Sequence, residues 1–104
     1  MKEESYERYW IFFETLASPT RLRIINVLRK GPKNVSEIIE QTGLEQSCGS
    51  HCLRKLQTCG FVTVSRKGKF RVYELNHKTI EPLMDLIDEH TQKYCSHLVK
   101  KHGA

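Results

Sequence analysis

The chain has 104 residues and a mass of 12.2 kDa, which is room for one domain and no more. Its 38% hydrophobic and 28% charged residues are ordinary for a globular protein and exclude a disordered one. No stretch approaches the roughly 18 apolar residues of a membrane span, and the polar, acidic residues 1–5 predict that no signal peptide is present. We therefore expect a cytoplasmic protein whose four cysteines are mostly reduced thiols.

The positive charge is concentrated in the middle of the chain. Residues 21–80 hold twelve Lys and Arg against four Asp and Glu, a net +8, whereas the two ends together carry −3. This distribution favours a surface that binds a polyanion; a solvated basic surface without a partner is the alternative. We do not expect an enzyme, because the sequence contains no Ser/His/Asp or Cys/His constellation and no Gly-rich phosphate loop.

The first part of the chain has the hydrophobic pattern of two helices. Residues 6–17 place aromatic and aliphatic side chains in a broad stripe that must pack on something. Ser18 and Pro19 predict an N-cap and a first helical position. The helix that they open is expected over residues 20–30, ending at Gly31, and to bury Leu22, Ile25 and Leu28.

A helix-turn-helix follows, and then a hairpin. Val35 and Ser36 predict a staple and an N-cap for a short helix over residues 37–41, and a second helix is expected over residues 46–59. Residues 61–64 and 70–75 alternate with period two around a basic turn, which predicts a β-hairpin. A last helix is expected over residues 79–99, with an apolar stripe suited to a partner helix. The fold class is therefore α+β, mainly α: one winged helix-turn-helix domain over residues 1–104, with its wing at 61–75.

The same segments carry a family resemblance. They are residues 16–24 (LASPTRLRI), Val35-Ser36-Glu37-Ile38, residues 46–56 (QSCGSHCLRKL), Gly60-Phe61-Val62 and the wing residues 66–73. Together they resemble the arsenical-resistance repressor (ArsR/SmtB) family. The resemblance covers roughly residues 13–75 and implies a homodimeric transcriptional repressor that releases DNA when an effector, commonly a metal ion, binds. It also implies that helices 6–17 and 79–99 form the dimer interface, to which we assign Tyr9, Trp10, Phe13, Leu83, Ile87, Tyr94 and Leu98.

The helix over residues 46–59 is the expected recognition helix. Successive positions advance by about 100°, which places Gly49, Leu53, Leu56 and Gly60 on the core side and polar residues opposite. We expect the DNA contacts to be made by Gln46, Ser47, Ser50, His51 and Arg54 of this helix and by Arg66, Lys67, Lys69 and Arg71 of the wing. The expected partner is double-stranded DNA with an inverted repeat. A polar, solvated face is the alternative.

The cysteines do not match the family's metal sites. Residues 38–40 contain no cysteine, and the zinc site of the last helix would retain at most two ligands, His77 and His90. Instead, Cys48 and Cys52 lie four residues apart on the recognition helix and can share a thiophilic ion such as zinc, cadmium or arsenite. Cys59 and Cys95 are further candidate ligands. Alternatively, these cysteines are buried as small hydrophobic side chains.

The sequence therefore predicts a homodimeric, sequence-specific DNA-binding regulator, expected to be a repressor released by a soft metal, a metalloid or a thiol oxidant. The second hypothesis is an effector-independent winged-helix regulator or an architectural DNA-binding protein.

Overall fold

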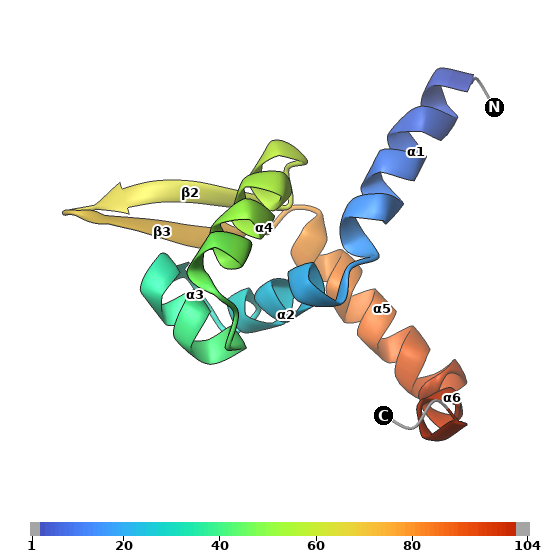
Figure 1. Ribbon diagram of the computed structural model, residues 1–104. Helices are drawn as coiled ribbons and strands as arrows, with labels where there is room; N and C mark the ends of the chain where they lie inside the picture. Colours follow the sequence, from blue (N-terminus) through green and yellow to red (C-terminus); the bar gives the residue numbers. More distant parts are fainter. Residues whose placement is uncertain (1–2, 102–104) are drawn as a thin grey trace.

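The computed structural model describes residues 3–101, and the side chains of residues 3–99. The elements, in chain order, are α1 (Glu3–Leu16), α2 (Pro19–Leu28), β1 (Lys33–Asn34), α3 (Val35–Thr42), α4 (Gln46–Thr58), β2 (Val62–Lys67), β3 (Phe70–Leu75), α5 (Ile80–Tyr94) and α6 (Ser96–Lys101). The hairpin β2–β3 extends to one side of the packed helices α2–α4, and α1 and α5 extend to the other (Figure 1). This arrangement confirms the predicted winged helix-turn-helix. Within residues 3–101, no helix has the length and hydrophobicity needed to cross a membrane.

The core lies where α2, α3 and α4 meet the sheet and the start of α5. Its fully buried side chains are Ile24, Ile25, Ile38, Leu53, Leu56, Phe61 and Leu75. The half-buried Phe12 joins this core at the C-terminal half of α1 by stacking on Phe61, with ring centroids 5.0 Å apart. The core therefore supports α4 and the wing from one side and holds one end of α1 from the other.

Helix α2 begins as predicted and buries two of the three residues predicted for it, Ile25 and Leu28. The Ser18 hydroxyl accepts the backbone N–H of Arg21 at 3.2 Å, and Pro19 occupies the first turn. The prediction for Leu22 was wrong, because this side chain is 38% exposed. The buried residues are Ile24, Ile25, Val27 and Leu28. Helix α2 contacts α1, α3, α4 and β3, and a helix surrounded in this way buries more than one narrow stripe.

Helix α3 begins at Val35, and its N-cap lies two residues before the expected N-cap Ser36. Asn34 is its N-cap: the Asn34 side chain accepts the Glu37 N–H, and the Glu37 carboxylate accepts the Asn34 N–H, both at 2.9 Å. This reciprocal pair satisfies two backbone donors at once, which Ser36 does not do here. Gly43, with φ of 73°, ends the helix in the left-handed conformation that glycine adopts without strain.

The sheet has three antiparallel strands in the order β1-β3-β2. The hairpin runs from the pair Val62–Leu75 to the pair Lys67–Phe70, so its first strand is longer than predicted. Gly68, with φ of 63°, begins the two-residue turn. Strand β1, which pairs Lys33 with Tyr73, was not predicted.

The expected continuous helix over residues 79–99 is interrupted, and that prediction was wrong. Cys95 has a φ of −119° and separates α5 from α6. The Ser96 hydroxyl donates to the Gln92 carbonyl at 2.8 Å. A side-chain bond to the carbonyl four residues earlier often accompanies a bend in a helix.

Candidate nucleic-acid interface

Helix α4 presents a polar face to solvent because its opposite face is fixed in the core. Gly49, Cys52, Leu53 and Leu56 are its buried residues. A Cβ at Gly49 would lie 2.4 Å from the Ile39 Cδ1 atom of α3, so the two helices of the motif approach closely here. The prediction that Gly60 belongs to the core was wrong. Gly60 is exposed and, with φ of 77°, follows the end of the helix.

The predicted DNA-contacting residues of α4 lie on its outer face. Four of them, Gln46, Ser47, His51 and Arg54, are exposed, and Ser50 is half-buried. The Ser47 hydroxyl donates to the Glu45 carboxylate at 2.6 Å, so this serine is already engaged in the free chain. The start of α4 has no side-chain cap. Exposed hydroxyl, amide, imidazole and guanidinium groups on one helix face are those that read base edges and bind phosphates.

The wing that carries the predicted basic residues packs against α4 through β2. Arg66, Lys67, Lys69 and Arg71 are all exposed. The Lys69 ammonium lies 5.7 Å from the centroid of the Phe70 ring, a cation–π arrangement at the tip. Gln57 was not among the predicted contacts, although it is exposed and lies three residues beyond Arg54 on the same side of α4.

The cysteines divide into a pair and two separate thiols. Cys52 is buried beside the exposed Cys48. Burial raises the pKa of the Cys52 thiol, the neighbouring Cys48 thiol raises it further, and the Arg21 charge opposes this shift. Cys59 does not join them, because its Sγ atom lies 3.3 Å from the Thr15 hydroxyl of α1. Within the side chains described, no three or more Cys, His, Asp or Glu residues gather as a metal site would require.

The two histidines that a family-type zinc site would retain have other neighbours. His77 lies between Glu74 at the end of β3 and Glu81 in α5; its Nε2 atom is 3.0 Å from the Glu74 carboxylate. The hydrogen bond to Glu74, followed by the one to Glu81, raises the pKa of His77. The His90 ring lies 4.8 Å from that of Tyr94, centroid to centroid.

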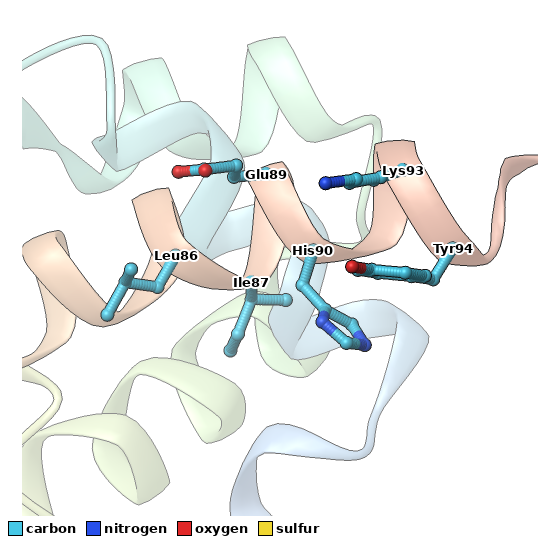
Figure 2. Close-up of a pocket in the computed structure, with 6 residues that line it drawn as sticks. All are labelled: Leu86, Ile87, Glu89, His90, Lys93 and Tyr94. Carbon is cyan, nitrogen blue, oxygen red and sulfur yellow. The ribbon is translucent and has the colours of Figure 1, made fainter.

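A second surface is apolar and formed by α1 and α5. Of the predicted interface residues, Tyr9, Trp10, Phe13, Tyr94 and Leu98 are exposed, and Leu83 and Ile87 are half-buried. A hollow of about 300 Å³ between α1, α2 and α5 is lined by Phe13, Leu16, Ala17, Leu22, Met84 and Ile87. Figure 2 shows a second hollow, of about 490 Å³, along α5. It mixes apolar and polar side chains, and its lining residues are Leu86, Ile87, Glu89, His90, Lys93 and Tyr94.

Comparison with known proteins identifies the family that the chain resembles. Residues 18–64 match the family described as "Bacterial regulatory protein, arsR family". The HTH-type transcriptional regulator NmtR of Mycobacterium tuberculosis is 39% identical over 79 residues, which are 76% of this chain and 66% of that protein. The chain thus spans slightly less than two thirds of this curated relative.

Two solved structures extend the match to most of the described fold. The crystal structure of M. tuberculosis Rv0081 superposes with a TM-score of 0.85 at 30% identity, covering 94% of this chain and 99% of that one. The homodimeric winged helix-turn-helix DNA-binding domain of Mb0332 from Mycobacterium bovis superposes with a TM-score of 0.83 at 22% identity, covering 93% of each chain, which supports the fold. The chain belongs to the ArsR family of bacterial regulatory proteins, a family of transcriptional regulators and not of enzymes.

Proposed function

We propose that the protein is a homodimeric transcriptional regulator that binds an inverted-repeat site in double-stranded DNA and acts as a repressor. The observation that carries the proposal is the exposed polar face of α4 beside a wing with four exposed basic residues. The helix has the side chains to read base edges, and the wing has the charge to bind phosphates. The functions of the NmtR relative and of the Mb0332 domain, as their names describe them, agree with this proposal.

The exposed apolar surface supports a dimer. Helix α1 contacts the rest of the described chain mainly through α2, and its N-terminal part projects away (Figure 1). A 14-residue helix is marginally stable in water by itself, and aromatic side chains on it favour coverage by a partner. A second copy of the chain would cover this face and present two α4 helices to two half-sites about one turn of DNA apart.

A binding experiment with two classes of variant tests the DNA contacts. Arg54→Ala should change base preference at one position of the site or weaken specific binding by about 1–3 kcal/mol. Lys67→Ala and Lys69→Ala should weaken binding to specific and random duplexes alike and flatten the salt dependence. Fluorescence anisotropy on a selected site and on random DNA, at several salt concentrations, measures both effects. If all three variants affect both duplexes equally, the division between base-reading and phosphate-binding residues is refuted.

For the effector, we propose a soft ion bound by Cys48 and Cys52. Thiolates are the ligands that soft ions select, and the two thiols are neighbours on α4. Because Cys52 is buried in the core, its ligation would change how α4 rests on the core and so lower DNA affinity directly. Two thiolates are too few for zinc or arsenite. A further thiolate would come from Cys59 after rearrangement, or from Cys95 of a second copy.

Metal titration of the reduced protein, with and without DNA, tests the effector. Zinc, cadmium, arsenite and an oxidant are added in turn, and DNA affinity is followed by gel shift. Cys48→Ser and Cys52→Ser should abolish the response without weakening DNA binding in the absence of metal, and Cys95→Ser tells whether a second copy supplies a ligand. If the double serine variant binds cadmium and arsenite as the wild type does, Cys48 and Cys52 are packing residues and not an effector site. If neither the metals, arsenite nor the oxidant changes DNA affinity, the hypothesis of an effector-independent regulator is favoured.

A further inference from the structure

Two arginines of the wing face each other across the hairpin. Arg66 of β2 and Arg71 of β3 are direct cross-strand partners. Like charges in such positions destabilise a hairpin. Within residues 3–99, neither guanidinium lies within ion-pairing distance of a carboxylate. The free protein therefore keeps an unfavourable pair of cations that a bound anion would neutralise.

The same two arginines line a hollow of about 480 Å³ between the C-terminal half of α4 and the wing. Its other lining residues are Gln57 of α4 and Val64 and Ser65 of β2. The polar side chains that face it offer two guanidinium groups and an amide N–H₂, all of which can donate hydrogen bonds. Ser65 lies between Val64 and Arg66 on β2, so its side chain points to the opposite face of the hairpin. Among the side chains of residues 3–99, no carboxylate lines it. Donors of this kind around a concave surface are suited to the oxygens of a phosphate group.

The position of the hollow indicates which phosphate it would hold. Gln57 is one helical turn beyond Arg54, so it extends the outer row of α4 toward the wing. A duplex lying along α4 and the wing would bring its backbone across this point. We infer that the hollow binds one phosphodiester of the DNA backbone, with Arg66 and Arg71 neutralising its charge and Gln57 orienting it. This inference rests on the proposed function.

The test pairs protein variants with DNA that lacks one charge. Duplexes of the selected site are made with a neutral methylphosphonate at one backbone position at a time. For the wild type, the substitution at the phosphate held by the hollow should weaken binding about tenfold, the loss of one charge-assisted hydrogen-bonded contact. The Gln57→Ala/Arg71→Ala variant should bind more weakly but be insensitive to that same substitution. Lys67→Ala, a wing charge outside the hollow, should remain fully sensitive to it.

A second measurement separates binding from folding. In the free protein, Arg71→Gln removes the charge that faces Arg66 and should raise the Tm. In DNA binding, the same change should lower the affinity and reduce the slope of log K against log salt by about one for each bound copy. The inference is overturned if the wild type and the double variant respond alike to every methylphosphonate, or if Arg71→Gln lowers the Tm. A wild type that binds no duplex would instead refute the proposed function.

Discussion

The proposed dimer can be weakened most directly at Trp10. This indole is 69% exposed on the projecting part of α1. Because a tryptophan side chain buries on the order of 200 Å² when fully covered, a partner would remove about 140 Å² of its surface from water. At about 25 cal/mol per Å² this contributes about 3.5 kcal/mol per copy. Trp10→Ala, which acts once on each copy, should raise the dimer Kd on the order of 10⁵-fold.

Sedimentation velocity over a range of protein concentrations measures this change. The wild type should be a dimer at micromolar concentration, and Trp10→Ala should be a monomer there and return to dimer as the concentration rises. Phe70→Ala is the matched control, because Phe70 is an aromatic residue of the wing tip that is also half-exposed (48%) and lies outside α1 and α5. The reasoning fails if the wild type is a monomer at these concentrations, or if the two alanine variants dissociate alike.

Two further predictions concern the core and the junction of wing and α5. Gly49→Ala would put a Cβ 2.4 Å from the Ile39 Cδ1 atom, so the end of the Ile39 side chain must move, and this cost should offset most of the roughly 1 kcal/mol that alanine gains over glycine in a helix. In an Ile39→Val background, which lacks that atom, the same change should stabilise the protein by about 1 kcal/mol in urea unfolding. His77→Gln should lower the Tm at pH 6 but not at pH 9. The reason is that the Glu74 and Glu81 carboxylates raise the pKa of His77 above its ordinary 6.5, so its contribution is complete below 6.5 and lost as pH rises through the raised value. Equal losses at the two pH values would contradict it.

Local patterns predicted most of the helices and the wing, because those signals lie within a few neighbouring residues. Ser18-Pro19 marked the start of α2, and the alternation on either side of Gly68 marked the hairpin. Strand β1 had no such signal: its two residues, Lys33 and Asn34, are polar and become a strand only by pairing with β3 about forty residues away. A pairing between residues distant in sequence produces no hydrophobic periodicity in the local sequence that would predict it.

The errors at helix ends and faces have local and tertiary causes. Asn34 and Ser36 are both good N-cap residues, and only the spacing of three residues from Asn34 to Glu37 distinguishes them. Leu22 is spaced from Ile25 and Leu28 as a residue on the core side of a helix would be, but it lies beside α1 and α5, next to the proposed dimer surface. For the candidate site, the angular spacing of residues along the helix correctly predicted that Arg54 and its neighbours lie on the exposed face. The contact of Cys59 with Thr15 was not predictable from that spacing, because it joins the end of α4 to α1.

The proposed DNA-binding surface of α4 and the proposed dimer surface of α1 are connected by contacts at the C-terminal end of α1. Arg21, in the first turn of α2, donates from Nε to the Thr15 carbonyl at 2.6 Å and from a terminal nitrogen to the Glu14 carbonyl at 3.0 Å, which satisfies carbonyls that a helix end leaves free. The fully buried Thr15 contacts Cys59 at the end of α4. The orientation of α1 is thus tied to α4 through buried or half-buried contacts rather than through a flexible loop. If two copies associate through α1, the distance between their recognition helices follows from these contacts, and the spacing of the DNA half-sites follows from that distance.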